Sequence, residues 1–198
     1  AYEIGVRLVG LGDVYKRQSL YRASNYAQIY GDGDGMFYDD SVNFVIENGV
    51  LKKYNGWQTF VEIPDTVTSI GDEAFKNNTS MVSVSIPDSV KSIGDSAFYG
   101  CTSLLGVVIP DSVEKTGRCA FQKCSKLASA YLPVNEKFTY MNAYMFESCT
   151  SLKKIEIPDN VTGIDGAAFA ECKKLSDVVL SKNLKTMGWQ VFGNDNKL

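Results

Sequence analysis

Apolar and polar residues follow one pattern along most of this chain, and the pattern returns at a fixed distance. In its clearest copy, residues 86–101, it is I-P-D-x-V-x-x-I-G-D-x-A-F-x-x-C. All five prolines occupy one position of the pattern, at intervals of 23, 23, 23 and 25 residues: Pro64, Pro87, Pro110, Pro133 and Pro158. A phenylalanine recurs at a second position, as Phe75, Phe98, Phe121, Phe146, Phe169 and Phe192. Such a period predicts a solenoid of stacked repeats.

The first half of each repeat predicts a short strand. The segment that begins at Leu104 places apolar residues at Val107 and Ile109, and alternate side chains of a strand point to the same side. Proline follows directly and ends the strand, because it has no N–H to donate. Val113 and Thr116 then supply a second inward pair.

The second half of each repeat predicts a very short helix on the convex side. Asp95 stands at a helix N-cap position, Ala97 and Phe98 face inward, and Cys101 follows on the same face. Strand and helix together predict an α/β repeat solenoid, a right-handed leucine-rich superhelix of about six turns over residues 57–198. The predicted core set is Ile63, Val67, Ile70, Phe75, Ile86, Val90, Ile93, Phe98, Leu104, Ile109, Phe121, Ile155, Ile157, Ile164, Phe169 and Leu180.

Residues 1–42 do not share the repeat, and we expect a leader that is not part of the fold. We interpret residues 1–18 as an artefact, because residues 7–18 resemble the translated end of a transposon-based sequencing adapter. A short amphipathic strand or helix is the alternative. Residues 43–56 place β-prone runs on both sides of Asn48-Gly49, a strong hairpin signal. We interpret the hairpin as a cap on the apolar face of the first repeat.

The last repeat departs from the pattern. Ser181 replaces the proline, and Trp189 stands at the helix-cap position. We expect the solenoid to be truncated at the C-terminus, with an apolar rim beside an unpaired strand edge, formed by Leu175, Val178, Leu180, Leu184 and Met187. An unpaired edge of this kind is a template for pairing with another chain. The sequence therefore predicts possible self-association through the uncapped last turn.

Composition and charge exclude several functions. The net charge of −3 over 198 residues argues against a nucleic-acid partner, which requires a clustered basic face. No apolar run approaches the ~20 residues that span a bilayer, so we expect no membrane insertion by this segment. Histidine, the commonest general base and zinc ligand, is absent. We therefore predict that the chain is not an enzyme and has no catalytic residues.

The cysteines indicate packing and not chemistry. Four of them share one repeat position: Cys101, Cys124, Cys149 and Cys172. Stacked turns lie ~4.8 Å apart, but parallel Cβ vectors do not suit disulfide geometry. We expect buried free thiols, which behave as small hydrophobic side chains. Zinc requires paired spacings, and Cys119-x4-Cys124 lacks partners, so we predict no metal and no cofactor.

The repeat resembles a known family. The unit I-P-D-x-V-x-x-I-G-x-x-A-F-x-x-C-x-x-L, about 23 residues long, is similar to the BspA-like leucine-rich repeat over residues 57–198. The resemblance implies large secreted or surface-anchored proteins of bacteria and some protists, several of them implicated in adhesion to host proteins or other cells. It thereby implies a cell-surface or extracellular location for this chain. Fold alone does not determine function.

The outward side of the predicted strands is the remaining candidate surface. Its larger side chains are the candidate partner-binding residues: Phe60, Glu62, Tyr131, Lys154, Glu156 and Asp177. The alternative interpretation is that these are ordinary solvent-exposed side chains with no role in binding. We expect a non-enzymatic, adhesin-like module that binds a protein or glycan on another cell or in the host matrix. An intracellular interaction scaffold and a passive spacer in a larger extracellular protein are the alternatives.

Overall fold

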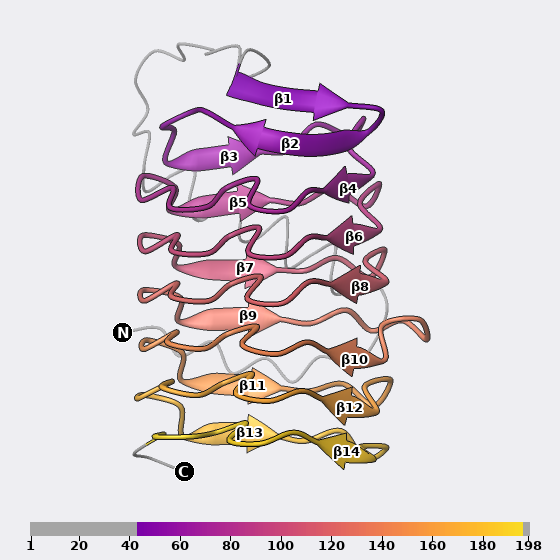
Figure 1. The fold of residues 1–198 in the computed structure, drawn as a ribbon, viewed down its shortest axis with the longest axis vertical. Helices are drawn as coiled ribbons and strands as arrows, with labels where there is room; N and C mark the ends of the chain where they lie inside the picture. The colour runs from indigo at the N-terminus through magenta and orange to yellow at the C-terminus, as the bar shows by residue number, and fades with distance from the viewer. Residues whose placement is uncertain (1–42, 196–198) are drawn as a thin grey trace, which may run out of the picture. The chain divides into compact units, whose positions relative to one another are not determined.

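The computed structural model describes residues 43–195, which wind into a solenoid of stacked turns (Figure 1). The predicted leader, residues 1–42, lies outside the described residues. One side of the stack carries three-residue strands: β3 (Phe60–Glu62), β5 (Ser83–Ser85), β7 (Gly106–Val108), β9 (Ser129–Tyr131), β11 (Lys154–Glu156) and β13 (Asp177–Val179). The other carries two-residue strands: β4 (Ser69–Ile70), β6 (Ser92–Ile93), β8 (Lys115–Thr116), β10 (Tyr140–Met141), β12 (Gly163–Ile164) and β14 (Thr186–Met187). The prediction of about six turns is confirmed.

A hairpin precedes the first turn. Strand β1 (Phe44–Glu47) pairs antiparallel with β2 (Val50–Tyr54). Asn48 and Gly49 between them have φ of 51° and 75°, the left-handed conformation that a tight hairpin turn requires. Strand β2 then pairs in parallel with β4, so the hairpin extends the sheet of shorter strands in the order β1-β2-β4-β6-β8.

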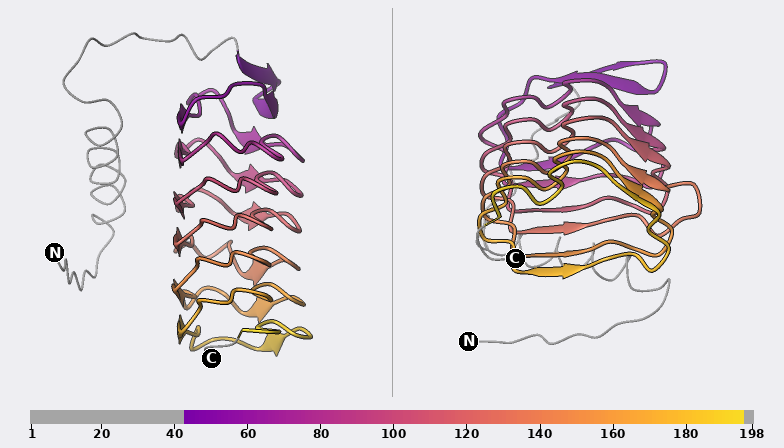
Figure 2. Two further views of the ribbon diagram at one scale, coloured as in Figure 1. Left: turned by 90° about the vertical axis from the view of Figure 1, so that its left-hand side faces the viewer. Right: turned by 60° about the horizontal axis from the view of Figure 1, so that its bottom comes forward.

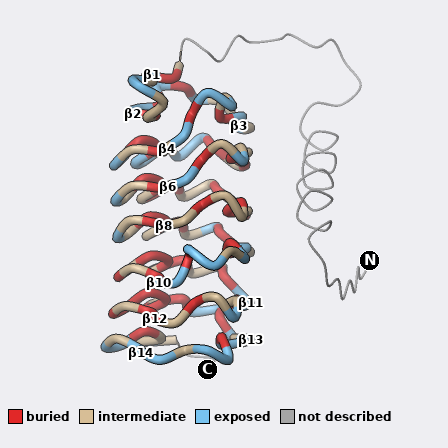
Figure 3. Tube along the Cα trace, turned by 90° about the vertical axis from the view of Figure 1, so that its right-hand side faces the viewer, coloured by how far each residue is buried: buried red, intermediate tan, exposed pale blue. Residues whose placement is uncertain are grey.

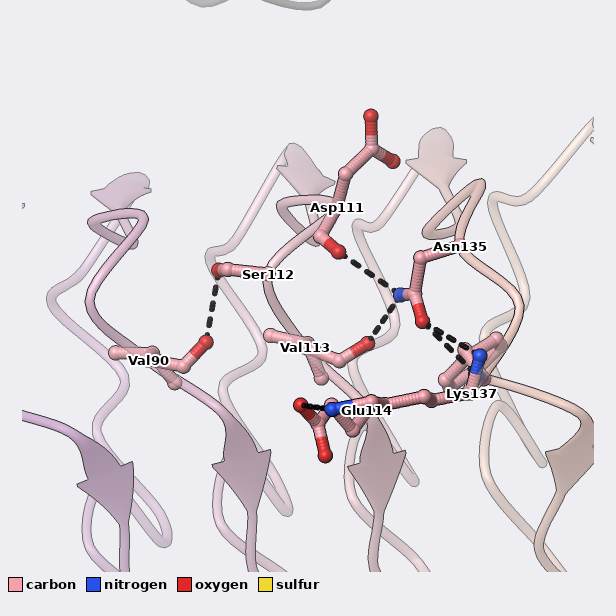
Figure 4. A network of polar contacts seen from close by, with 8 residues as sticks. Val90, Asp111, Ser112, Val113, Glu114, Asn135 and Lys137 are labelled. Carbon is pink, nitrogen blue, oxygen red and sulfur yellow. Dashed lines mark hydrogen bonds and ion pairs between the residues drawn. The ribbon is translucent and has the colours of Figure 1, made fainter.

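The ladder of shorter strands is interrupted between β8 and β10, where the two-residue insertion falls. The inserted loop projects from the side of the stack (Figure 2). Its Asn135 donates from Nδ2 to the backbone oxygens of Asp111 and Val113, both at 2.8 Å, and accepts from the Lys137 amide at 2.9 Å (Figure 4). Lys137 Nζ also contacts Glu114 Oε1 at 2.7 Å. The loop thus absorbs the insertion while remaining bonded to the preceding turn.

The predicted helix is wrong, and the fold is therefore a β-solenoid and not an α/β one: residues 43–195 contain no α-helix. In the segment predicted to be a helix, the backbone amides alternate between two kinds of partner. Those of Glu73 and Phe75 donate to carbonyls of the next turn, at 2.9 and 2.7 Å, whereas that of Lys76 donates back to Glu73 at 3.0 Å. An α-helix would use every amide within the segment.

Backbone conformation shows the same interruption in every turn. The residue two positions before each phenylalanine has a φ between 48° and 59°: Glu73, Ser96, Cys119, Tyr144, Ala167 and Gln190. A left-handed residue at this place breaks a right-handed helix. The segment therefore forms consecutive tight turns that are bonded to the turns above and below.

A column of aromatic rings fills the interior. From Phe75 to Phe192, successive phenylalanine rings stack with centroids 4.8–5.6 Å apart and planes within 9° of parallel. Tyr54 of the hairpin continues the column, 5.2 Å from Phe75. Buried segments recur at the same place in successive turns (Figure 3). All members of the predicted core set are buried except Leu180, which is 42% exposed because no described turn covers its far side.

Replacing one ring inside the column should destabilise the fold strongly. Phe98 is fully buried between two rings, so we expect Phe98→Ala to lower the free energy of unfolding by about 3–5 kcal/mol through loss of contacts and formation of a cavity. Urea unfolding followed by circular dichroism measures this change. Phe192→Ala removes a partly buried ring with one stacked neighbour and should cost less. Equal losses in the two variants would contradict the packing described.

Candidate binding surface

The longer strands present one continuous series of outward side chains. Their middle residues Val61, Val84, Val107, Ala130 and Ile155 are buried. Their flanking residues form two columns along the stack, aligned by the parallel register of the strand pairs. The first column is Phe60, Ser83, Gly106, Ser129, Lys154 and Asp177, and the second is Glu62, Ser85, Val108, Tyr131, Glu156 and Val179.

The predicted site residues fall into two groups on this face. Phe60 and Glu62 lie on β3, separated from the others by β5 and β7, whose first outward residues Ser83 and Gly106 are buried. The second group lies on the three neighbouring strands β9, β11 and β13. We call it the sheet-face patch, and it consists of Tyr131, Lys154, Glu156 and Asp177. Phe60 and Glu62 are therefore not contiguous with the other four candidates.

The sheet-face patch combines an aromatic ring with charges of both signs. Tyr131 is 45% exposed. Lys154 Nζ lies 3.2 Å from Asp177 Oδ2, and both side chains are more than half exposed, so the ion pair contributes little to stability. Glu156 is exposed two residues beyond Lys154 on β11, opposite Val179. Such a surface can offer a ring, a carboxylate and a separable ion pair to a partner.

The thiols form a buried column, as predicted. Each of the four donates to the carbonyl of a phenylalanine in the turn before, at 3.2 Å: Cys101, Cys124, Cys149 and Cys172. Burial raises the pKa of the last three, and the Cys124 thiol together with burial raises that of Cys101. These groups stay protonated and have structural roles. No group of three or more possible metal ligands occurs among residues 43–195.

Sequence reasoning missed a second group of exposed and half-buried side chains, which lies on the turn segments. Arg118 and Trp189 each contact the Tyr144 ring from different turns. Lys123 Nζ donates to Tyr99 Oη at 2.7 Å. The available signal was the presence of arginine, tyrosine and tryptophan at repeat positions outside the strands. Only the fold shows that these positions are neighbours.

The last turn is more covered than predicted. Leu175 is fully buried as a member of the hydrophobic core, contrary to the expectation that it lines an open rim. Val178 and Leu184 are partly buried, and Leu180 and Met187 are 42% and 47% exposed. Ser181, in place of proline, donates from Oγ to Val161 O at 2.6 Å. The apolar rim is therefore narrower than expected.

Parallel strands from successive turns, a period of about 23 residues and a buried apolar ladder define a leucine-rich repeat solenoid. The chain belongs to the family described as BspA type leucine rich repeat region, whose model matches residues 46–175 and 103–198 with six copies. A comparison with curated proteins gives no significant match. No helix among residues 43–195 is long and apolar enough to cross a membrane.

Solved structures support the same fold. A leucine-rich repeat protein from Eubacterium ventriosum is similar with a TM-score of 0.67 and 21% identity, over 81% of this chain and 55% of that one. The T. pallidum leucine-rich repeat protein is similar with a TM-score of 0.59 and 26% identity, over 70% of this chain and 77% of that one. A leucine-rich repeat protein from Bacteroides ovatus is similar with a TM-score of 0.54 and 28% identity, over 71% of this chain and 48% of that one. The chain thus spans about half the length of two of these proteins.

Thiol reactivity tests the buried column. Cys119 is the one cysteine that is not fully buried, so we expect the folded chain to react with iodoacetamide at a single thiol and at all five only after unfolding. Burial raises the pKa of Cys119, so its rate should continue to rise with pH beyond the range of an ordinary thiol. Mass spectrometry after timed labelling measures both. Cys119→Ser should abolish native labelling; modification of a second thiol in the folded chain would contradict the arrangement.

Proposed function

We propose that this chain is a non-enzymatic binding module and that it recognises a protein partner through the sheet-face patch. Its membership of a leucine-rich repeat family supports protein binding in general. The observation that carries the proposal is the concentration of large outward side chains on β9, β11 and β13, while β5 and β7 present small ones. Extended sheet faces of solenoids provide rigid surfaces of this kind.

The composition of the patch suits a partner with both apolar and charged groups. Tyr131 offers a half-exposed ring, and tyrosine is enriched among residues that dominate binding energy. The Lys154–Asp177 pair can exchange its internal contact for bonds to a partner, because water already competes for it. A complementary surface would place an apolar side chain on Tyr131 and a basic group near Glu156.

We infer that the module belongs to a surface or secreted adhesin-like protein, with the partner on another cell or in the host matrix. This rests on the family resemblance. A glycan ligand, an intracellular scaffold role and a passive spacer role are the competing possibilities. We also infer that the hairpin caps the first turn, since β2 pairs with β4 and the Tyr54 ring lies 5.2 Å from Phe75.

Replacing Tyr131, Lys154 and Glu156 together with alanine should weaken partner binding without unfolding the chain. The wild-type chain is applied to arrays of immobilised matrix proteins and of glycans, and affinity for each ligand found is measured by surface plasmon resonance. We expect at least a tenfold (~1.4 kcal/mol) loss of affinity for a protein ligand, because truncation of central contacts commonly costs that much.

The matched control is Lys52→Ala with Lys53→Ala, which removes exposed residues of β2 on the hairpin. The control should bind like wild type, and both variants should keep the urea midpoint. Unchanged affinity of the triple variant would place the site elsewhere. Binding to glycans alone would replace the protein assignment, and binding to neither array would favour a spacer.

We infer further that the last turn associates with a second copy of the chain. Leu180 and Met187 are exposed apolar residues beside the open edges of β13 and β14, and unpaired edges accept another strand. Sedimentation velocity should therefore show dimers that increase with concentration. Leu180→Lys with Met187→Lys should remove them through charge repulsion. Val134→Lys, which alters a 60% exposed residue of the inserted loop, should not. A monomeric wild-type chain at every concentration would refute the inference.

A further inference from the structure

An arginine and a tryptophan, both rare in this solenoid, lie against one tyrosine ring on its turn segments. The Arg118 guanidinium carbon lies 6.0 Å from the centroid of the Tyr144 ring. The Trp189 ring meets the same tyrosine edge to face, with centroids 5.9 Å apart and planes at 74°. These residues come from three different turns, and we call them the aromatic corner. Trp189 is 58% exposed, so its ring is open to solvent instead of filling the core.

The aromatic corner is held in place by the backbone. Tyr144 adopts a left-handed φ of 59°, and its amide donates to the Gly166 carbonyl of the next turn at 3.1 Å. A side chain on Gly166 would put its Cβ 2.5 Å from Trp189 Nε1, so glycine is what allows the indole to lie over that turn and reach Tyr144. The Trp189 carbonyl accepts from the Ala167 amide at 2.8 Å. A surface ordered before binding loses less entropy when a ligand arrives.

The charge of the aromatic corner is not balanced within the described residues. Arg118 is the one arginine beyond residue 22. Five lysines of residues 43–195 form ion pairs with Asp or Glu, whereas no carboxylate of this part lies within ion-pair distance of Arg118. The Arg118 side chain is exposed. Its backbone amide, and not its guanidinium, donates to Asp95 Oδ1 at 2.7 Å. The planar guanidinium therefore remains available for a carboxylate, which it matches with two parallel bonds.

We propose that the aromatic corner is a second binding surface of this protein, for an extended acidic peptide segment of a partner protein. A carboxylate of the segment binds Arg118, and an apolar side chain two residues along packs on Trp189 and Tyr144. Side chains two apart on an extended strand are separated by ~6.8 Å. The 6.0 Å between the Arg118 guanidinium carbon and the Tyr144 ring centroid is close to that spacing, and the Trp189 ring beside Tyr144 widens the apolar surface. Tryptophan, tyrosine and arginine are also the residue types enriched at protein-binding hot spots.

This surface is distinct from the sheet-face patch. The patch lies on β9, β11 and β13, whereas the residues of the aromatic corner lie outside the strands, on the turn segments. The two proposals can therefore fail separately.

Selection from a random peptide library displayed on phage tests the proposal. The full chain is immobilised, and selections on wild type are compared with selections on Arg118→Ala and Trp189→Ala. We expect wild type to enrich peptides with Asp or Glu two residues from an aromatic or large aliphatic residue, and the variants to lose them. Synthetic peptides of the enriched class should bind at least about tenfold more weakly to Arg118→Ala, the usual effect of losing one charge-assisted bond. Replacing the acidic residue by its amide should weaken binding to wild type similarly.

The controls separate this surface from general effects. Lys123→Ala removes the cation of the neighbouring Tyr99 contact and should leave selection unchanged, as should the triple variant of the sheet-face patch. Each variant must keep the wild-type urea midpoint, and Arg118→Lys keeps the charge if the alanine variant does not fold. Enrichment of the same peptides on wild type and Arg118→Ala, enrichment without acidic residues, or no enrichment would overturn the proposal. Binding of oligogalacturonate in place of acidic peptides would also overturn it.

Discussion

Stacking of identical turns at a fixed spacing is the constraint on which the structure depends. The phenylalanine column shows it most directly, because rings from Phe75 to Phe192 keep centroid distances of 4.8–5.6 Å in near-parallel planes. A ring can occupy this place only if the backbone returns to the same position in every turn. The amide-to-carbonyl bonds between successive turns, such as Phe98 N to Ala120 O at 2.8 Å, enforce that return. Removal of one ring would therefore leave a gap between two turns that are bonded to their neighbours.

The same constraint explains the other internal features. The thiol of each turn bonds to a phenylalanine carbonyl of the turn before, so four cysteines repeat one contact at 3.2 Å. Where two extra residues enter, the ladder of shorter strands breaks between β8 and β10, yet the aromatic column continues from Phe121 to Phe146 at 5.4 Å. Insertions are thus absorbed at the surface, since a loop can project into solvent while the core cannot change its spacing.

Outward positions are released from this constraint, and the candidate functions lie there. On the longer strands, small residues on β5 and β7 give way to Tyr131, Lys154, Glu156 and Asp177. On the turn segments, Arg118, Tyr144 and Trp189 are side chains that do not belong to the buried core. A side chain that the core neither needs nor excludes is free to serve recognition, which is why the two surfaces differ from turn to turn while the interior does not.

The sequence by itself determined the repeat, its period and the identity of the core. Burial and period are properties of each unit, so a pattern such as Val67, Ile70 and Phe75 predicts burial wherever the unit occurs. The Asn48-Gly49 hairpin was readable for the same reason, because its turn chemistry is local. Leu180 was assigned wrongly, since its burial depends on a neighbouring turn and not on its own segment.

Only the tertiary structure decided what the segment before each cysteine becomes and which surface residues meet. The local sequence of this segment favours a helix. Hydrogen bonds to the adjacent turn, however, use the backbone amides that a helix would need, as at Glu73 and Phe75. Arg118, Tyr144 and Trp189 are far apart in sequence: Arg118 and Trp189 share one repeat position, three residues before a phenylalanine, and Tyr144 occupies the next position of its own turn. They become neighbours because Gly166 leaves space for the indole to cross a turn. Contacts of this kind depend on side-chain reach between turns, which no repeat pattern contains.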